Sequence, residues 1–422
     1  MRIFKFGGAS VKDAKGVRNL LKVLDHEGTN DTLVVVSAMG KMTNAFEEVV
    51  HAYLYKKEDV PVAMKVVKEY HINLVTTLFE KENLIFIEVQ RLFESLQEFI
   101  DQNTVEDYNY IYDQVVSYGE LLSTKIISAF LEKEKISNHW LDIRTVLTTD
   151  SNYRNATVAW EETALNLEKL DRDKLYITQG FISSDKKGNT TTLGREGSDY
   201  TAGILAYCLQ AESVTIWKDV PGVLNADPRV FEETVLLENI SYQEAIEMAF
   251  YGASVIHPKT IKPLENKRIP LYVRSFEALE NTGTKVSKGI DLHPKTHCFI
   301  VKKNQILVSI STNDFSFMVE ENISYIFKLL HDFKLKVNLI QNSAISFSVC
   351  LEDGYQNFSK FYEKLHPSFK VKYNTNITLF TVRHFDDDSI KKIHKKGDVL
   401  LQQTSRETVQ LAIAEKNNYA NQ

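Results

Sequence analysis

The sequence predicts an α/β fold with a mostly parallel sheet sandwiched by helices, followed by smaller α+β modules. Near-continuous apolar runs separated by helical stretches fill the first two-thirds of the chain. Such runs are typical of strands buried on both faces of a parallel sheet. The pattern loosens over residues 281–294, which contain Gly and Pro, and we place a boundary there. Beyond it, strands and helices alternate as in ferredoxin-like modules.

The first part opens with a short apolar strand, and the later apolar runs are predicted as further buried strands. These runs cover residues 33–37, 175–178, 214–217 and 271–273. No strong strand pattern occurs between residues 43 and 134. Apolar residues there recur at helical spacing over 60–80, 84–101 and 105–134. This block therefore predicts a helical insertion over one edge or end of the sheet.

Residues 1–285 are expected to form the main α/β domain, and residues 298–422 two intertwined α+β modules. Predicted strands of the second part lie at 306–311, 335–340, 345–351, 369–373, 377–382, 398–403 and 408–414. Its predicted helices lie at 322–332 and 355–365. Residues 385–396 are short and polar for a core helix, so the second module is expected to be abbreviated.

The overall composition narrows the class of protein. The chain has 422 residues, of which 43% are hydrophobic and 25% charged, as in ordinary globular domains. A net charge of −6 does not favour nucleic acid or an anionic membrane as partner. No run approaches the roughly 18 apolar residues of a membrane span, and Lys5 with two glycines interrupts any signal-peptide core.

The cysteines indicate the compartment. Cys208, Cys298 and Cys350 are far apart and odd in number, so they fit neither a disulfide framework nor a zinc cluster. A reducing, cytoplasmic location is the simplest interpretation.

The first dozen residues predict a phosphate site. The first strand carries Lys5 near its end and runs into Gly7 and Gly8, and Ser10 can cap a following helix. Consecutive glycines bring backbone N–H groups close to an anion, and a helix N-terminus points its positive end at the same place. The spacing is neither that of a Walker A loop nor that of a Rossmann fingerprint. Taken alone, the segment could equally be a Gly-Gly turn with a solvated lysine.

A second polar segment covers residues 190–202 and opens a helix after the strand and turn near Phe181. Ser198 or Asp199 stands in N-cap position, which alone would describe a capped helix after a Gly-rich loop. Arg195, between two glycines, suits bidentate capture of a carboxylate or phosphate. Asp199 could pair with Lys5 and aim its ammonium group at a transferring phosphoryl group.

A third polar segment covers residues 216–229. Lys218 and Asp219 follow a strand, a Pro-Gly turn comes next, and an Asp-Pro-Arg sequence ends at Arg229. Such loops at the carboxyl ends of parallel strands are where open α/β sheets bind ligands. Residues 37–44 follow the second strand, and Glu120 lies within the helical block. A lone glutamate in a helix is usually a solvated surface residue.

Six motifs in one order carry a family resemblance. They are Lys-Phe-Gly-Gly-x-Ser-Val, Ser-Ala-x-Gly-x-x-Thr-Asn, Gly-Glu, Thr-Leu-Gly-Arg-x-Gly-Ser-Asp-Tyr, Trp-x-Asp-Val-x-Gly-Val with Asp-Pro-Arg, and Gly-Ala-x-Val-Ile-His-Pro. The chain closely resembles monofunctional aspartokinases of the amino acid kinase superfamily. Motifs cover residues 2–276, and residues 306–414 are similar to paired ACT modules.

The resemblance implies an ATP-dependent aspartate 4-kinase that makes 4-phospho-L-aspartate for lysine, threonine and methionine synthesis. Lys5 would bridge the β- and γ-phosphates, and Asp199 would orient Lys5. The implied aspartate-binding residues are Thr43, Glu120, Phe181, Thr192, Arg195 and Ser198. The implied nucleotide-binding residues are Lys5, Gly7, Gly8, Ser10, Lys218, Asp219, Leu224 and Arg229. Mg²⁺ would be bound through the ATP phosphates, so no protein metal ligands are expected.

The resemblance also implies regulation. ACT pairs in this family usually bind lysine or threonine at a dimer interface, so a homodimer through these modules is expected. The segments 312–318 and 337–343 would line that effector site. The abbreviated tail puts feedback inhibition in question, because the same segments could be merely module loops and strand ends.

Three departures from the family pattern affect the site. Leu224 stands where many members have a tyrosine near the adenine, and Ser254 replaces a common lysine for which Lys259 could compensate. Glu196 follows Arg195 where a small residue is often seen. Two alternatives stay open: another amino-acid kinase, such as one acting on glutamate, and a non-catalytic ACT sensor of amino acids.

Overall fold

The computed structural model describes residues 1–253, 256–314 and 316–415, and these residues form two compact units. The first unit comprises residues 1–223, 236–246 and 255–294, and the second comprises 224–235, 247–254 and 295–422. The first unit therefore runs to Pro294. Residues 224–235 and 247–254 precede Pro294 in sequence but belong to the second unit. The composition of the sequence did not predict this assignment.

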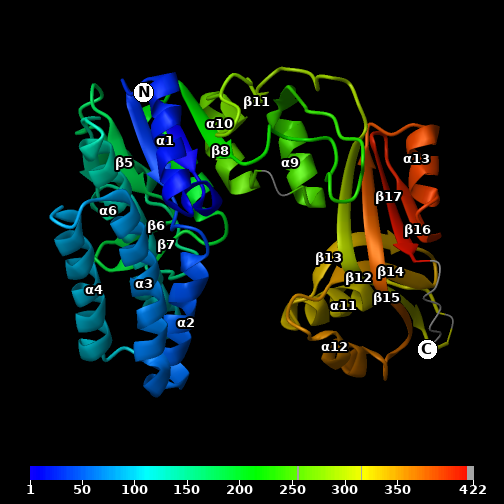
Figure 1. Cartoon of the computed structure of the whole chain (residues 1–422). Helices are drawn as coiled ribbons and strands as arrows, with labels where there is room; N and C mark the ends of the chain where they lie inside the picture. Colours follow the sequence, from blue (N-terminus) through cyan, green and yellow to red (C-terminus); the bar gives the residue numbers. More distant parts are fainter. Residues whose placement is uncertain (254–255, 315, 416–422) are drawn as a thin grey trace. The chain divides into compact units, whose positions relative to one another are not determined.

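The first unit is built on an eight-stranded sheet in the order β3-β5-β2-β1-β8-β10-β11-β9 (Figure 1). Its strands are β1 Arg2–Phe6, β2 Thr32–Val36, β3 His139–Leu141, β5 Tyr176–Gln179, β8 Ser213–Lys218, β9 Asn239–Ser241, β10 Leu271–Ser275 and β11 Thr284–Ser287. All neighbouring strands pair in parallel except β10 and β11. The predicted parallel sheet is confirmed. β11 lies inside the segment that we expected to be a boundary.

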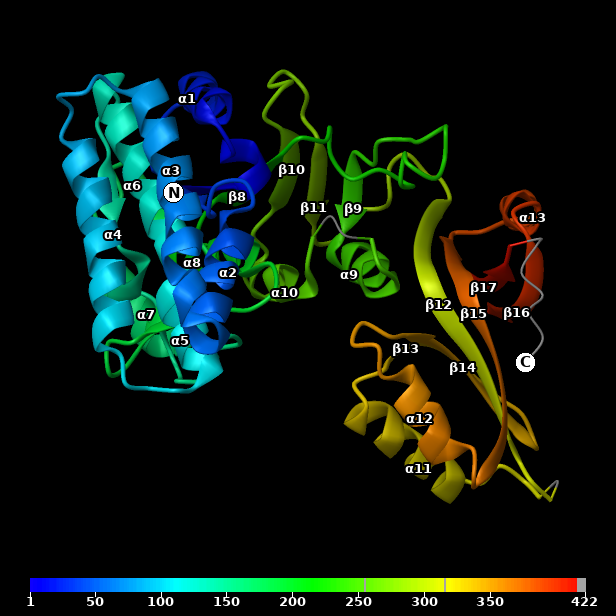
Figure 2. The ribbon, with the colours of Figure 1, turned by 60° about the horizontal axis from the view of Figure 1, so that its bottom comes forward.

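Helices pack around this sheet, and a small second sheet joins β4 Thr148–Thr149, β6 Ile182–Asp185 and β7 Thr190–Thr192. The helices are α1 Ala14–Glu27, α2 Met42–Tyr55, α3 Val60–Leu78, α4 Ile85–Gln102, α5 Tyr108–Val116, α6 Tyr118–Lys133, α7 Trp160–Leu167, α8 Gly197–Leu209, α9 Tyr242–Tyr251 and α10 Pro258–Lys267. Helices α2, α3, α4 and α6 lie side by side (Figures 1 and 2), and all of them fall in the segment 43–134 that was predicted to be helical. No helix among the described residues is long and apolar enough to cross a membrane.

Two local expectations in this unit were wrong. The helix predicted over 105–134 divides at Ser117, whose hydroxyl donates to the carbonyl of Gln114 at 2.8 Å and competes with the helix ladder. Ser10 does not cap α1. It lies in a 3-10 turn, and its hydroxyl donates to the carbonyl of Trp217 at 3.2 Å. Asp13 caps α1 instead, accepting from the amide of Gly16.

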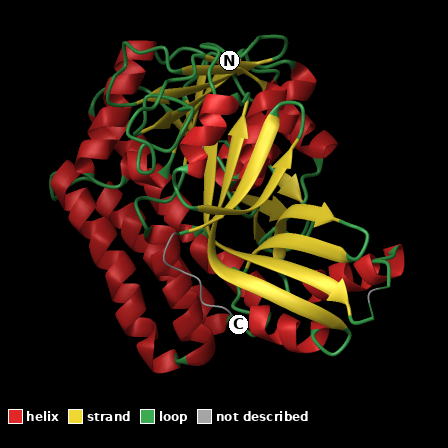
Figure 3. Cartoon of the chain, turned by 90° about the vertical axis from the view of Figure 1, so that its right-hand side faces the viewer, coloured by secondary structure: helices red, strands yellow, loops and turns green. Residues whose placement is uncertain are grey.

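The second unit contains a six-stranded antiparallel sheet in the order β13-β14-β12-β15-β17-β16; Figure 3 draws these strands, like all others, in yellow. Its strands are β12 Cys298–Thr312, β13 Lys336–Asn342, β14 Ser346–Glu352, β15 Phe369–Arg383, β16 Asp398–Thr404 and β17 Thr408–Ala414. Its helices are α11 Glu320–Asp332, α12 Phe358–Leu365 and α13 Asp387–His394. Helices α11 and α12 pack on the β12–β14 half through one apolar cluster that includes Val308 and Phe361.

The two halves of this sheet share their long central strands, β12 and β15. Cys298–Lys302 of β12 pairs with Leu379–Arg383 of β15, while Gln305–Thr312 pairs with Phe369–Ile377. The two separate strands predicted at 369–373 and 377–382 are therefore one strand. The register of the β12–β15 pairing shifts near Gln305, between these two paired stretches.

The expectation that residues 385–396 lack a helix was wrong. They form α13, which begins with a reciprocal cap between Asp386 and Ser389 and carries lysines at its C-terminal end. These local interactions stabilise a polar helix of only two turns. Ile393 provides the buried contact, packing with Val382 and Val409 of the sheet.

Candidate functional site

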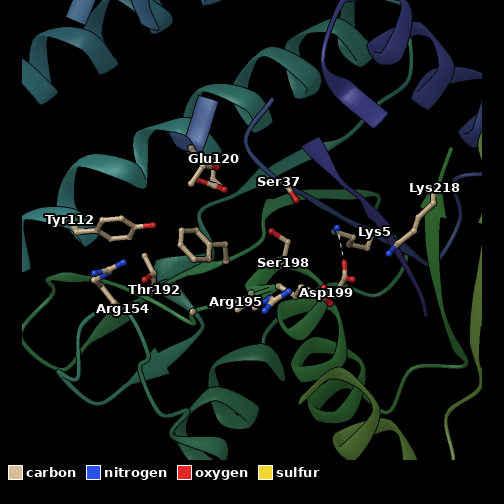
Figure 4. Close-up of a pocket in the computed structure, with 15 residues that line it drawn as sticks. Lys5, Ser37, Tyr112, Glu120, Arg154, Thr192, Arg195, Ser198, Asp199 and Lys218 are labelled. Carbon is tan, nitrogen blue, oxygen red and sulfur yellow. Dashed lines mark ion pairs between the residues drawn. The ribbon is translucent and has the colours of Figure 1, made fainter. Parts of the chain in front are cut away.

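A pocket of the first unit lies at the carboxyl ends of its central strands and has a volume of about 470 Å³ (Figure 4). It is lined by Lys5, Ser37, Thr43, Tyr112, Glu120, Arg154, Phe181, Thr192, Gly194, Arg195, Glu196, Gly197, Ser198, Asp199 and Lys218. The residues come from distant parts of the sequence because parallel strands end at one edge of the sheet. Lys5 on β1 lies in register between Val35 of β2 and Ile216 of β8. Loops after such strands converge on one site.

An ion pair marks one end of the pocket. Lys5 Nζ lies 2.6 Å from Asp199 Oδ1, and the two side chains are only 10% and 5% exposed. Asp199 sits in the first turn of α8, so the predicted pairing of these residues is confirmed. Lys218 Nζ reaches into the same end (Figure 4). Because Lys5 is buried, its ammonium group acts on an anion with less screening than it would in bulk solvent.

The start of α8 differs from its prediction. Neither Ser198 nor Asp199 is the N-cap, because α8 begins at Gly197 and Glu196 precedes it in a left-handed conformation (φ 53°). A Cβ on Gly197 would come within 2.6 Å of Phe181 Cδ2, so only glycine allows this close approach. Ser198 and Asp199 therefore lie within the first turn of α8 and line the pocket instead of capping the helix.

The glycine pair after β1 lets two loops touch. The amide of Gly40 donates to the carbonyl of Gly8 at 2.9 Å, which ties the loop after β1 to the loop after β2. A Cβ on Gly8 would lie 2.6 Å from the carbonyl oxygen of Ala38 and 2.9 Å from that of Gly40. Both obstacles are backbone atoms that cannot rotate away.

Replacing Gly8 with alanine is therefore expected to push these two loops apart. We expect a lower Tm and a KM for ATP raised about tenfold, because the loop beside Lys5 would shift. Thermal unfolding and steady-state kinetics measure both quantities. Gly354→Ala is the matched control, since its Cβ would meet nothing within 4 Å. An unchanged Tm and KM for Gly8→Ala would contradict this account.

Glu120 is a buried acid, not the solvated surface residue that a lone helical glutamate usually is. It lies in the first turn of α6 and is only 2% exposed. Its Oε1 accepts a hydrogen bond from the amide of Ala38 at 3.0 Å, while its buried Oε2 has no hydrogen-bond partner among the described residues. Burial raises the pKa of the Glu120 carboxyl to about 8. A cationic group delivered to this pocket would restore the charged form.

Sequence reasoning missed Asp113 and the side chains around it. Asp113 is fully buried on α5 and accepts from the amide and the hydroxyl of Thr192, at 2.8 and 2.7 Å. It also accepts from the amide of Arg154 at 3.0 Å. Burial raises the pKa of the Asp113 carboxyl to about 6. Asp113 thus holds Thr192 and Arg154, two pocket-lining residues, in a fixed relation.

Phe181 is held in the pocket by an unusual backbone. Its φ is 68°, and its amide donates to the hydroxyl of Thr201 on α8 at 2.9 Å. An aromatic residue is uncommon in this left-handed region, and such strain gathers at ligand sites. Ser37, Tyr112, Arg154 and Glu196 also line the pocket without having been predicted to. Two of them had a sequence signal, because Ser37 opens the Ser-Ala-x-Gly motif and Glu196 follows Arg195 in a polar motif.

Some predicted nucleotide residues do not line this pocket. Gly7, Gly8 and Ser10 lie in the turn after β1, and Asp219 is exposed just after β8. Leu224 and Arg229 belong to the second unit, where Arg229 pairs with Asp227 at 2.7 Å. Ser254 lies outside the described residues, and so does Phe315 of the predicted effector segment. Lys259 donates to the side chain of Asn155 at 2.7 Å.

Within the described ranges, no group of three or more His, Cys, Asp or Glu side chains is arranged to hold a metal ion. The acids that line the pocket are Glu120, Glu196 and Asp199. The buried Oε2 of Glu196 has no hydrogen-bond partner within those ranges.

Comparison with known proteins identifies the family. Residues 1–275 match the model of the amino acid kinase family. The chain is 32% identical over 362 residues to lysine-sensitive aspartokinase 3 of Escherichia coli, which covers 83% of this chain and 78% of that protein. The chain belongs to the aspartokinases of the amino acid kinase family. Aspartokinases phosphorylate the side-chain carboxylate of aspartate with ATP, and this chain is an aspartate kinase.

Solved structures extend the match over both units. The crystal structure of Escherichia coli aspartokinase III in complex with lysine and aspartate matches with a TM-score of 0.84 and 26% identity, covering 98% of this chain and 96% of that one. The same enzyme in complex with aspartate and ADP matches with a TM-score of 0.80. The aspartokinase fold, including an ACT-type regulatory part, is thereby confirmed.

A longer relative matches this chain over part of its length. The bifunctional aspartokinase/homoserine dehydrogenase 2 of Arabidopsis thaliana is 30% identical over 384 residues. That match covers 87% of this chain but 42% of the bifunctional protein.

Proposed function

We propose that the pocket of the first unit is where this aspartokinase transfers the γ-phosphoryl group of ATP to the β-carboxylate of L-aspartate, giving 4-phospho-L-aspartate. One observation carries the proposal: the pocket joins a buried cation, Lys5, to a buried acid, Glu120, one oxygen of which has no hydrogen-bond partner in the part of the chain that the structure describes. An α-amino acid with a second carboxylate carries the two complementary charges. Such a ligand can present its ammonium to Glu120 and its reactive carboxylate towards Lys5.

Phosphoryl transfer to aspartate requires no covalent bond between the protein and the substrates. The β-carboxylate of aspartate is ionised at pH 7, so it attacks without a general base. Phosphoryl transfer then depends on positioning and on neutralising the charge of the transferring group. Lys5 supplies that charge, and Asp199 fixes its direction through the 2.6 Å ion pair. Asp199 is in this sense a positioning residue.

The amino-acid end of the pocket would bind aspartate through side chains from several elements. Glu120 takes the α-ammonium group, and Arg195 takes a carboxylate. The remaining proposed contacts are Thr43, Phe181, Thr192 and Ser198, all of which line the pocket. Phe181 and Gly197 pack so closely that a Cβ on Gly197 would collide with the Phe181 ring.

The nucleotide would lie beyond Lys5, with its phosphates over the Gly7-Gly8 turn and near Lys218. Asp219, Leu224 and Arg229 stay proposed nucleotide contacts from the loops after β8. Mg²⁺ suits this site as part of the nucleotide, because it keeps phosphate and water ligands and needs few carboxylates. Asp199 and Glu196 are the pocket side chains that could hold the water shell of that ion, since Glu196 Oε2 has no hydrogen-bond partner among the described residues. When bound, Mg²⁺ neutralises phosphate charge.

The second unit would regulate the first by binding lysine or threonine. The support comes from the ACT-type fold and from the Escherichia coli relative, whose structure contains lysine. The proposed site lies along residues 312–318 and 337–343, where Phe317 is 71% and Ile340 40% exposed. Apolar side chains so exposed at strand and loop ends suit pairing with a second copy. A homodimer through these modules and a cytoplasmic location stay predictions.

The test is ATP-dependent formation of an acyl phosphate, trapped as the hydroxamate with hydroxylamine. L-aspartate and L-glutamate are assayed side by side, and lysine or threonine is then added in turn. We expect turnover with aspartate alone, and inhibition by one of the two amino acids. Turnover with glutamate would overturn the substrate assignment. Absence of turnover with both acids would favour a sensor that binds amino acids without catalysis.

A further inference from the structure

A tyrosine outside the pocket reaches from the helical insertion to the loops beside Lys5. We infer that Tyr70 on α3 is a positioning residue, whose hydroxyl holds the Gly7-Gly8 turn in the shape that binds the phosphates of ATP. This inference rests on the proposed function, which places the nucleotide phosphates over that turn. Tyr70 does not line the pocket, so it acts through the backbone that it contacts.

The hydroxyl of Tyr70 meets two loops at one point. It donates a hydrogen bond to the carbonyl of Lys12 at 2.5 Å. A Cβ on Gly40, whose φ is 55°, would lie 3.3 Å from the same hydroxyl and 3.5 Å from Lys12 Cβ. Lys12 directly follows the 3-10 turn Gly8–Val11 after β1, and Gly40 lies in the loop after β2. One side chain of α3 therefore lies against both loops.

The turn after β1 is held at two other points. The Gly8 carbonyl accepts from an amide of the loop after β2 at 2.9 Å, and the Ser10 hydroxyl donates to the carbonyl of Trp217 on β8 at 3.2 Å. The third point is Lys12, held from α3. Each bond fixes a different part of the turn. Losing the bond at Lys12 would therefore free the end of the turn that leads into α1.

The ring that carries this hydroxyl is held in place. Tyr70 packs edge-on against His71, with ring centroids 5.1 Å apart. His71 is buried, and its Nδ1 donates to the carbonyl of Val67 at 2.7 Å. Burial and the nearby Asp13 carboxylate raise the pKa of the Tyr70 hydroxyl to about 12, so it remains a donor at neutral pH. A donor whose own side chain is fixed by packing orients the backbone that it holds.

The aspartate end of the pocket is held by other contacts. The loop after β2 begins at Ser37, whose carbonyl accepts from the Ser123 hydroxyl at 2.8 Å. The next amide, that of Ala38, donates to Glu120 at 3.0 Å. Ser123 and Glu120 both lie on α6, so these bonds do not depend on Tyr70. Losing the Tyr70 hydroxyl should therefore disturb the nucleotide end of the pocket and leave the aspartate end in place.

The test is Tyr70→Phe, which keeps the ring and removes the hydroxyl. We expect the KM for ATP to rise about fivefold, while kcat and the KM for aspartate stay within about twofold, because one hydrogen bond that shapes nucleotide binding is lost. Titration calorimetry with ADP should show the same loss of affinity without turnover. Tyr55→Phe is the matched control and should change none of these values. Tyr55 is 65% exposed on α2, and its hydroxyl has no hydrogen-bond partner among the described residues.

Two outcomes would overturn the inference. An unchanged KM for ATP, whether or not Tm falls, would mean that the Tyr70 hydroxyl serves stability alone. Equal rises in the KM for ATP and the KM for aspartate would mean that its loss loosens the whole pocket. Failure of the unaltered chain to phosphorylate aspartate would instead overturn the proposed function itself.

Discussion

Lys5→Ala is expected to lower kcat about a thousandfold while L-aspartate still binds. The lysine ammonium is nearly buried, and Asp199 points it into the pocket from 2.6 Å. A fixed charge in a water-excluded site acts strongly on charge that develops in the transition state, and removing one such donor typically costs about 10²–10³ in kcat. The hydroxamate assay gives kcat, and titration calorimetry gives the affinity for aspartate. Lys15→Ala, at an exposed lysine on α1, is the matched control.

Removing Lys5 alone leaves Asp199 buried without its cation, which lowers stability. The double variant Lys5→Ala with Asp199→Asn removes that charge and should regain part of the lost Tm, yet stay inactive. Recovery of turnover in the double variant would mean that the loss in Lys5→Ala came from the stranded carboxylate. Near-normal turnover in the single variant would show that Lys5 does not neutralise the phosphoryl group.

The strands of the main sheet could be predicted because burial on both faces demands unbroken apolar runs, as in Thr32–Val36. Elements held by local polar interactions were harder to predict. α13 has one buried aliphatic contact at Ile393 and depends on its cap at Asp386 and Ser389. The sequence analysis predicted two strands in place of β15 because the middle of the strand, near Asn374 and Asn376, is polar. Pairing with β12 nevertheless makes it one continuous strand.

The active-site residues also differ in whether the sequence could predict them, depending on whether they belong to a local motif. Lys5, Arg195 and Asp199 could be predicted because each follows a strand or opens a helix within a short Gly-rich motif. Arg154 and Asp113 could not, since neither belongs to a local pattern. They meet only because α5 and the loop after β4 converge on Thr192. Glu120 was predicted from the family motif alone, and its burial is a property that the tertiary structure adds.

Glu120→Gln is expected to raise the KM for aspartate about a hundredfold. The Glu120 carboxylate is the group proposed to pair with the α-ammonium, and glutamine keeps its shape without its charge. A hydrogen bond to a charged group contributes roughly 1.5–3 kcal/mol, and its loss in a buried site falls at the upper end. Kinetics with aspartate measure this effect. Glu47→Gln is the control, because Glu47 accepts from Tyr112 without lining the pocket.

The same residue makes aspartate binding depend on pH. The pKa of Glu120 is raised from 4.5 to about 8 by burial, so the free enzyme holds this proton at pH 7. Binding the α-ammonium favours the charged form, and nearly one proton should be released per aspartate bound. kcat/KM should rise with pH up to about 8, because it reports the free enzyme. Calorimetry in buffers of different ionisation enthalpy counts the protons, and Glu120→Gln should release none.

Raising the pH should lower the free energy of unfolding through Glu120, whereas it should strengthen the binding of aspartate. Between pH 4.5 and about 8 the folded chain holds a proton on Glu120 that the unfolded chain has lost. The free energy of unfolding therefore falls as pH rises through this range, and the contribution present below pH 4.5 is gone above about 8. Glu120→Gln has no such proton, so its Tm relative to the unaltered chain should increase steadily from pH 5 to pH 8.5. A constant difference across these pH values would mean that Glu120 is ionised in the free enzyme. Both effects have one cause. The buried Glu120 carboxyl ionises at a cost in the free enzyme, and the α-ammonium group of bound aspartate removes that cost. At higher pH the affinity for aspartate therefore rises while the stability of the free enzyme falls.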